Sequence, residues 1–174
     1  MNISAIISEY NPIHNGHIYH INNTIKKAKS DGIICVMSGN FVQRGEPSII
    51  DKWNRAKMAL LNGIDLVLEL PAIYAVSSAE FFAFGAVSLL NNLNVVSNLS
   101  FGSEDGNIKS LYRLAKFLTD ETDDYKALLK SYINLGLPYY VARNKAVHEL
   151  LGENVDDLLT VSYTHLTLPT NREV

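Results

Sequence analysis

The chain has 174 residues and a formal net charge of −3; 47% of its residues are apolar and 19% are charged. This balance is typical of a globular domain with a sizeable core, and the charge argues against a broad basic surface for nucleic acid. The single cysteine rules out an intrachain disulfide, no signal peptide is visible, and the apolar stretch at residues 81–90 is too short to span a bilayer. We therefore expect a cytoplasmic protein without a membrane partner.

Apolar runs of strand-like length alternate with stretches of helical periodicity in the N-terminal part of the chain. The strand-like runs are residues 2–8, 33–37, 65–70 and 95–101. Helices are predicted where Ile18, Ile21, Ile25 and Ala28 recur, over residues 51–62 before Gly63, and from a capping box at residues 77–80 to about residue 93.

This alternation predicts an α/β fold with a doubly wound, Rossmann-like parallel sheet. Strands that are apolar throughout and separated by helices belong to a parallel sheet covered on both faces. Right-handed crossovers wind the chain to both sides, and ligands bind outside the carboxyl ends of the strands, where the strand order reverses. With the order 3-2-1-4, the loop after the first strand faces Phe101, Gly102, Ser103 and Glu104. We expect these two segments to form one pocket.

From residue 107 onward the pattern is helical, with apolar side chains at Leu111, Leu114 and Leu118 and again through residues 125–132 and 141–151. We expect a nucleotide-binding core at residues 1–106 and a helical extension at residues 107–161. Residues 162–174 fit neither a helix nor a core strand, so we expect a non-native tail, with an ordinary disordered tail as the alternative.

Two features are expected to belong to the core rather than to a site. Cys35 lies inside the second apolar run and is interpreted as a small buried side chain. An aromatic cluster is predicted to be core rather than a stacking platform; its members are Tyr74, Phe81, Phe82 and Phe84.

A short polar motif stands where the first strand gives way to the first helix: His14, Asn15, Gly16 and His17. Backbone N–H groups and the positive end of a helix dipole meet at such a junction, which favours bound phosphate. Gly16 leaves room for phosphate to approach the backbone, and two imidazoles can donate hydrogen bonds to phosphate oxygens as charge builds on them. The motif predicts a nucleoside triphosphate site with His14 and His17 as catalytic residues; structural roles for both rings are the alternative.

Two further interpretations of this segment stay open. His20 lies one turn beyond the motif, and three histidines at this spacing can converge on zinc, although no other ligand pattern supports a metal site. The strand ends in Glu9, Tyr10 and Asn11, which can contact adenine, ribose or Mg²⁺, or can be plain turn residues.

A polar loop with two glycines, residues 38–47, follows the second strand. Ligand-binding loops occupy that edge of a parallel sheet, and an arginine there suits a phosphate or a carboxylate. The candidate substrate-binding residues are Ser38, Gly39, Asn40, Gln43 and Arg44. A surface turn is the alternative. The next helix carries Asp51, Lys52 and Arg55, which fit a solvated face as well as a site.

Four blocks of this sequence resemble the bacterial tRNA(Met) cytidine acetate ligases, which belong to the HxGH nucleotidylyltransferase superfamily. The blocks are residues 8–17 (SEYNPIHNGH), 37–47 (MSGNFVQRGEP), 68–71 (LELP) and 100–104 (SFGSE). The HxGH motif alone is moderately specific, whereas the four blocks in this order are highly specific. The likeness runs through residues 1–161.

The resemblance implies an ATP-dependent ligase that activates acetate as acetyl-adenylate, releases pyrophosphate and acetylates the wobble cytidine of elongator tRNA(Met). The implied ligands and partners are ATP with Mg²⁺, acetate and that tRNA. Carried over by position, the ATP site consists of Ile7, Ser8, Glu9, Tyr10, Asn11, Pro12, Ile13, His14, Asn15, Gly16, His17, Ile18, Tyr19, His20 and Gly102.

The sequence stops following the family at about Ser162. The family's Asn-Asn-containing segment and the arginine-bearing stretch that completes its ATP site are absent, so we expect a truncated, amino-terminal portion. Two other functions stay open: nucleotidyl transfer to a small phosphorylated acceptor, and ATP binding without turnover. The sequence does not specify an oligomeric state.

Overall fold

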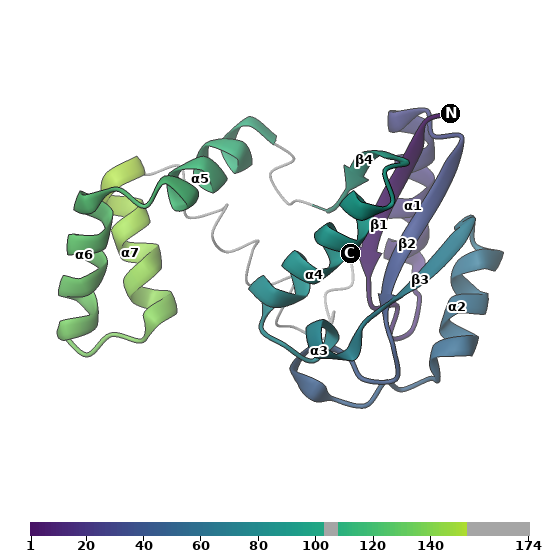
Figure 1. The fold of residues 1–174 in the computed structure, drawn as a ribbon, viewed down its shortest axis with the longest axis horizontal. Coiled ribbons are helices and arrows are strands. Elements are labelled where there is room, and N and C mark those ends of the chain that lie inside the picture. Colours follow the sequence, from purple (N-terminus) through teal and green to yellow (C-terminus); the bar gives the residue numbers. More distant parts are fainter. Residues whose placement is uncertain (103–107, 153–174) are drawn as a thin grey trace. The chain divides into compact units, whose positions relative to one another are not determined.

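In a computed structural model of the protein, residues 1–102 and 108–152 are described, with the exception of the Arg44 and Ser110 side chains. The chain divides into two units, Met1–Gly102 and Ser103–Val174, which we call the sheet unit and the helical unit (Figure 1). The predicted boundary at residue 106 and the predicted tail at residues 162–174 lie outside the described residues, as do Ser103 and Glu104.

The sheet unit is built on four parallel strands in the order β3-β2-β1-β4. The strands are β1 (Ile3–Ser8), β2 (Gly32–Ser38), β3 (Leu66–Leu70) and β4 (Val96–Ser100). This order confirms the predicted doubly wound, Rossmann-like sheet, and it places the reversal of strand order between β1 and β4. Ile6 at the centre of β1 pairs with Cys35 on one side and with Ser100 on the other.

Helices cover both faces of the sheet because successive side chains of β1 and β2 point to opposite faces. One face packs under α1 (Asn15–Ala28) and α2 (Lys52–Leu61), and the other under α3 (Ala72–Ala75) and α4 (Ala79–Asn92) (Figure 1). The first core includes Ile6, Ile21, Ile33, Cys35 and Ala59, and the second Ala5, Ile34, Val36, Phe82 and Ala86. Cys35 is therefore a buried core residue, as predicted.

The two outer strands of the sheet are less covered than the two inner strands. Leu66 on β3 and Leu99 on β4 are both exposed. Because β3 and β4 are edge strands of this unit, each has a neighbouring strand on only one side, and their side chains are less covered than those of β1 and β2.

The start of α4 also departs from the prediction. Ser78 precedes the helix but makes no side-chain cap, so the predicted capping box does not form. Instead the Ser77 hydroxyl donates to the carbonyl of Ile73 at 2.5 Å, in the short helix α3 that the sequence analysis did not predict. Pro71 directly precedes this helix, and its carbonyl accepts the N–H groups of Tyr74 and Ala75.

The aromatic cluster is only partly core. Phe82 is buried and Tyr74 is half-buried, whereas Phe81 and Phe84 are exposed, so the prediction is wrong for these two residues. The reason is helical geometry, because Phe82 shares the sheet-facing side of α4 with Ala86 four residues later, and Phe81 and Phe84 project from other sides.

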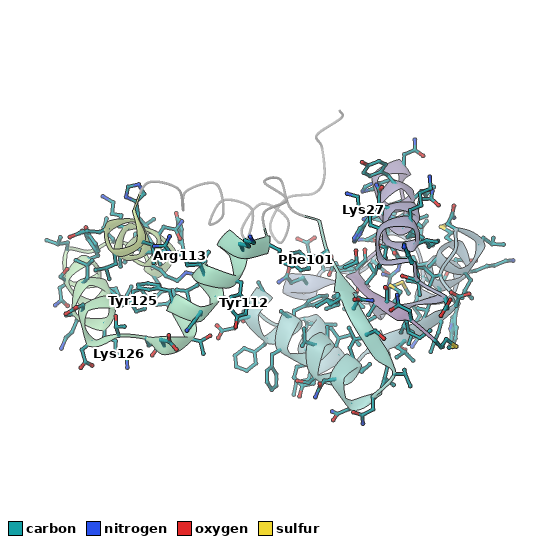
Figure 2. The ribbon with its side chains drawn as sticks, turned by 90° about the horizontal axis from the view of Figure 1, so that it is seen from above. Lys27, Phe101, Tyr112, Arg113, Tyr125 and Lys126 are labelled. Atoms are coloured by element: carbon teal, nitrogen blue, oxygen red, sulfur yellow. The ribbon has the colours of Figure 1, made fainter. Side chains whose placement is uncertain are left out.

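The helical unit contains α5 (Ile108–Asp120), α6 (Asp123–Asn134) and α7 (Tyr139–Leu151). Its buried core is Leu114, Tyr125, Ala146 and Val147. Tyr125 points from α6 toward the neighbouring helices (Figure 2) and meets Phe117 edge-on at 5.4 Å between ring centroids. None of the helices in the described parts of the chain is long and apolar enough to cross a membrane.

Candidate functional site

The first loop, residues 9–14, connects the carboxyl end of β1 to α1. Tyr10 in this loop has a positive φ of 45° and its side chain is 1% exposed, packed in the core below the loop. Its ring meets His17 edge-on at 5.0 Å between centroids. Burial raises the pKa of the Tyr10 hydroxyl and raises the pKa of the neighbouring Cys35 thiol to about 12. Both groups therefore stay protonated near neutral pH and support the loop rather than transfer protons.

The two histidines of the motif form a reciprocal cap at the start of α1. Nδ1 of His14 accepts the N–H of Gly16 at 3.1 Å, and Nδ1 of His17 accepts the N–H of His14 at 3.2 Å. The rings stack with their centroids 3.7 Å apart and an interplanar angle of 28°. Because each Nδ1 accepts a hydrogen bond, each neutral ring carries its proton on Nε2.

Gly16 makes this arrangement of rings possible. A β-carbon at this position would lie 3.0 Å from Cε1 and 3.1 Å from Nδ1 of His14, so any other residue would push the ring away from the helix. From the sequence, Gly16 is expected to leave room for the approach of phosphate. The structure adds that it admits the His14 ring itself.

The start of α1 has a positive electrostatic character. Its first turn contains no acidic side chain, so the positive end of the helix dipole is not neutralised locally. His14, Asn15 and Gly16 are exposed there, and His17 is half-buried. An anion can thus reach the first turn and the His14 ring from solvent.

A polar contact joins α1 to the carboxyl end of β4. Nε2 of His20 lies 2.9 Å from Oγ of Ser100, and Oγ1 of Thr24 lies 2.7 Å from the same oxygen. Gly102 follows two residues later and is exposed. The structure therefore brings the first loop and the start of the predicted partner segment to the same edge of the sheet, across the β1–β4 reversal.

Three histidines do not converge on a metal at this site. Nδ1 of His14 and of His17 each accept a backbone N–H, and Nε2 of His20 faces Ser100. In the described parts of the chain no three His, Cys, Asp or Glu side chains are grouped so that they could hold a metal ion.

The second loop, residues 39–50, lies beside the first and contains the 3₁₀ turn Gln43–Gly45. Its predicted site residues are engaged with neighbouring segments. Ser38 is buried, the N–H of Gln43 donates to the Glu9 carboxylate at 2.6 Å, and Oδ1 of Asn40 accepts the N–H of Lys52 at 3.1 Å. The Arg44 side chain lies outside the described residues.

Arg55 on α2 is the largest fully buried side chain among the described residues, at 0% exposure. Its guanidinium donates to the carbonyls of Ile50 at 3.0 Å, Glu9 at 2.5 Å and Ser38 at 3.0 Å, and to that of Gly39. Burial lowers the pKa of Arg55. The interpretation of this position as a solvated face is therefore wrong.

A sequence signal for this burial was present and was missed. Arg55 and Ala59 lie four residues apart, which puts them on the same face of a helix, and both are buried. A charged residue on the apolar face of a predicted helix marks a group that must find partners inside the protein.

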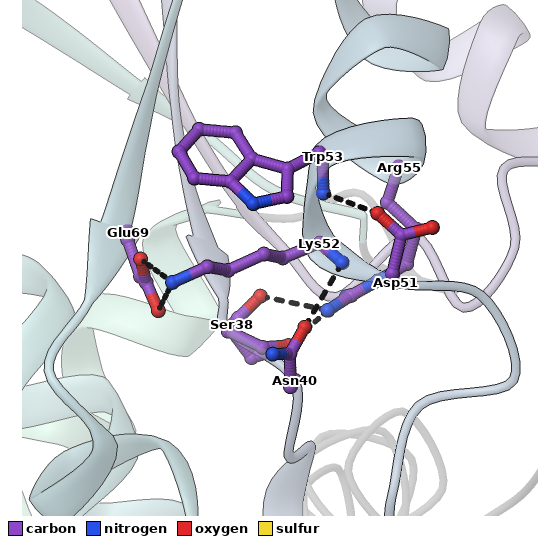
Figure 3. A network of polar contacts seen from close by, with 8 residues as sticks. Ser38, Asn40, Asp51, Lys52, Trp53, Arg55 and Glu69 are labelled. Atoms are coloured by element: carbon purple, nitrogen blue, oxygen red, sulfur yellow. Dashed lines mark hydrogen bonds and ion pairs between the residues drawn. The ribbon is translucent and has the colours of Figure 1, made fainter.

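The neighbouring charged residues have structural partners as well (Figure 3). Asp51 caps α2 by accepting the N–H groups of Trp53 and Asn54. Lys52 forms an ion pair with Glu69 on β3, with both carboxylate oxygens within 2.9 Å of its ammonium nitrogen. Gly39 packs so closely against Glu69 that a β-carbon would overlap its carboxylate. The ends of β2 and β3 and the start of α2 are thus held together.

A separate hollow lies along β4 and the end of α4, and it is lined by Leu90, Asn94, residues 96–99 and their neighbours. Ligands of doubly wound sheets bind at the carboxyl ends of the strands. The junction of the two loops, not this hollow, is therefore the candidate site.

Comparisons with known proteins identify the family to which the chain is similar. A family model described as HIGH Nucleotidyl Transferase matches residues 1–173. The chain is 53% identical over 168 residues to the tRNA(Met) cytidine acetate ligase of Clostridium botulinum strain Hall, and 56% identical over 155 residues to that of Clostridium acetobutylicum. These alignments cover 93% and 89% of this chain, but 41% and 39% of the relatives. The chain thus spans about two fifths of the length of the curated relatives it matches.

Solved structures show the same relationship. A crystal structure of Thermotoga maritima TmcAL bound with alpha-thio ATP is 41% identical and superposes with a TM-score of 0.85, over 95% of this chain and 43% of that one. An apo form of Thermotoga maritima TmcAL gives the same TM-score and identity.

Proposed function

The chain belongs to the HIGH nucleotidyl transferase family, and from this premise we propose that it forms the ATP-binding part of a tRNA(Met) cytidine acetate ligase. The observation that carries the proposal is the stacked pair of His14 and His17 at the start of α1, with both Nδ1 atoms tied to backbone N–H groups. Because Nδ1 is the acceptor, Nε2 is the nitrogen of each neutral ring that can donate a hydrogen bond to phosphate.

In this proposal ATP binds along residues 7–20, with Gly102 beside the nucleotide. The positive end of the α1 dipole and the exposed first turn of the helix face the phosphates. The two imidazoles donate hydrogen bonds to phosphate oxygens whose negative charge increases in the transition state, so they stabilise that state more than the bound substrate.

The proposed reaction has two steps. An acetate oxygen attacks the α-phosphorus in line with the bond to the β-phosphate; that P–O bond breaks, pyrophosphate leaves and acetyl-adenylate forms. The exocyclic amine of the wobble cytidine then attacks the acetyl carbonyl, AMP leaves with the electron pair of the broken C–O bond, and the amine loses a proton. Catalysis of the first step consists mainly of positioning and charge stabilisation.

The second loop is proposed to hold the acetate side of the site through Ser38, Gly39, Asn40, Gln43 and Arg44. Mg²⁺, when bound, would neutralise charge on the leaving pyrophosphate. The described residues offer no cluster of three ligating side chains, so we propose that Mg²⁺ is carried by the triphosphate. We propose that the complete ligase binds tRNA. A protein that modifies tRNA is expected in the cytoplasm.

The proposal is tested by ATP binding and by acetate-dependent ATP–pyrophosphate exchange. Calorimetry on this chain should show ATP binding. Exchange is measured on the chain and on a chimera that adds the remaining C-terminal part of the Clostridium botulinum relative, with acetate, phosphopantetheine and nicotinamide mononucleotide as alternative acceptors.

Exchange that requires acetate supports the ligase. Exchange with phosphopantetheine or nicotinamide mononucleotide instead identifies a nucleotidylyltransferase for a small phosphorylated acceptor. ATP binding with no exchange in either protein identifies a binding module without turnover.

A further inference from the structure

We propose that Arg55 is a positioning residue. Its hydrogen bonds hold the first and second loops in a fixed position relative to each other, and this increases the affinity of the first loop for ATP. The inference rests on the proposed function, because it assigns a role in the same site to a residue that does not touch the nucleotide. It predicts that ATP bound on the first loop also stabilises the second loop.

Arg55 connects three separate segments from inside the protein. Its guanidinium donates to the Glu9 carbonyl at the start of the first loop, to the Ser38 and Gly39 carbonyls at the end of β2, and to the Ile50 carbonyl at the end of the second loop. The planar fork of five N–H donors is the feature that allows one side chain to do this; a lysine ammonium has three donors on one atom.

Two side chains of the first loop complete the connection. The Glu9 carboxylate accepts the N–H of Gln43 at 2.6 Å, and Oδ1 of Asn11 accepts the N–H of Ile49 at 2.8 Å. Each bond crosses from the first loop to the second, so the second loop is fixed at two points, one at the start of the 3₁₀ turn and one beyond its end. Neither loop can shift without breaking bonds to the other.

The buried positive charge of Arg55 favours the hydrogen bonds that connect the two loops. A buried guanidinium without acceptors would be strongly unfavourable, so Arg55 requires all of its carbonyl partners. The Glu9 carboxylate is partly buried nearby, and its negative charge is attracted by Arg55 while burial raises its pKa. Loss of Arg55 would therefore release several carbonyls and remove a positive charge that favours the ionised form of the partly buried Glu9 carboxylate.

The first test compares Arg55→Lys and Arg55→Met with Lys57→Met, an exposed cation two residues away on the same helix. ATP affinity is measured by calorimetry and the unfolding midpoint by circular dichroism. We expect Arg55→Lys to weaken ATP binding by about tenfold or more, Arg55→Met to weaken it further, and Lys57→Met to leave it within about twofold. Equal ATP affinity in wild type and Arg55→Lys would overturn the inference, even if the midpoint fell, because that pattern indicates a purely structural role.

The second test needs no variant and covers the case in which the Arg55 variants do not fold. Amide hydrogen exchange is followed in the wild-type chain with and without ATP at Gln43 and Ile49, whose N–H groups bond to the first loop. Tyr125 is the matched control, because its N–H also bonds to a side-chain oxygen, that of Thr122, within the helical unit. We expect ATP to slow exchange at Gln43 and Ile49 by about tenfold and to leave Tyr125 unchanged.

The outcomes separate this inference from the proposed function. If the wild-type chain binds ATP but exchange at Gln43 and Ile49 does not change, the loops are not coupled, and the proposed ATP site stands without this role for Arg55. If the wild-type chain does not bind ATP at all, both proposals fail.

Discussion

The sheet unit and the helical unit differ in what they bury. Among the described residues, four polar or charged side chains are buried, and all four belong to the sheet unit: Ser4, Thr24, Ser38 and Arg55. The buried cluster of the helical unit consists of Leu114, Tyr125, Ala146 and Val147. Fully buried polar side chains thus lie in the sheet unit, whereas the described part of the helical unit buries individual polar atoms of partly exposed side chains, such as Nε of Arg143 and Oδ1 of Asn144.

The difference indicates which buried residues are not explained by their contribution to stability alone. Burying a polar group is unfavourable unless it is hydrogen-bonded, and apolar replacements of similar volume are often as stable or more stable. Thr24 meets Ser100 beside His20, and Arg55 joins the two loops. The buried polar residues at the carboxyl edge of the sheet therefore surround the candidate site. The helical core carries no comparable cluster among the residues described.

The largest expected effect tests whether the chemistry belongs to the sheet unit. His17→Ala should lower acetate-dependent ATP–pyrophosphate exchange by roughly 100-fold or more, which corresponds to about 2.7 kcal/mol, because a donor to the developing phosphate charge is lost. His148→Ala, a histidine of α7, is the matched control and should leave exchange within about twofold. A similar loss of exchange activity in both variants would contradict the assignment of the catalytic residues to the sheet unit.

The second effect concerns the core of the helical unit. Leu114→Ala should destabilise α5 to α7 by about 2 kcal/mol, because it deletes buried methyl groups from a small apolar cluster. Amide exchange in these helices measures the loss. ATP affinity should remain within about twofold of wild type, and a parallel fall in affinity would show that the helical core contributes to the site.

A third prediction concerns packing in the sheet unit away from the site. Gly85→Ala should destabilise the sheet unit by about 1 to 3 kcal/mol in chemical denaturation, although alanine favours helices, because a β-carbon at this position on α4 would overlap the Tyr74 ring. In a Tyr74→Gly background, which removes both the ring and the Tyr74 β-carbon, the same substitution should become neutral or stabilising. A loss that persists in that background would assign the effect to another contact.

The smallest expected effect is a pH dependence at the start of α2. Hydrogen bonds from the backbone and side chain of Asn54 are the main reason that the pKa of Asp51 is below its ordinary value of 3.8. The stability that this carboxylate contributes is therefore complete above that value and is lost as the pH falls through the lowered pKa of the folded state. Asp51→Asn, which keeps a cap, should lower the melting temperature by about 2 °C near neutral pH. The difference from wild type should disappear in acid; a constant difference would contradict the assignment.

Much of the fold was predictable because the signals for it are local. Continuous apolar runs and helical spacing located all four strands and the longer helices of the described residues, and a glycine with φ of 101° at position 63 follows α2 as expected. The histidine motif located the candidate site because a strand followed by a helix places backbone N–H groups there whatever the remaining sequence is. The short helix α3 was missed, since four residues carry too little periodicity to be recognised.

The sequence by itself therefore determined the order of the elements and the parallel sheet, and it indicated the segment proposed to bind phosphate, because apolar runs, helical spacing and short motifs are local signals. Only the tertiary structure decided which side chains complete the site. Arg55 lies 46 residues from the Glu9 carbonyl that it holds, and Ile49 lies 38 residues from Asn11. A charged side chain is solvated or buried according to the partners that the fold brings to it, and those partners come from distant segments that no local pattern identifies.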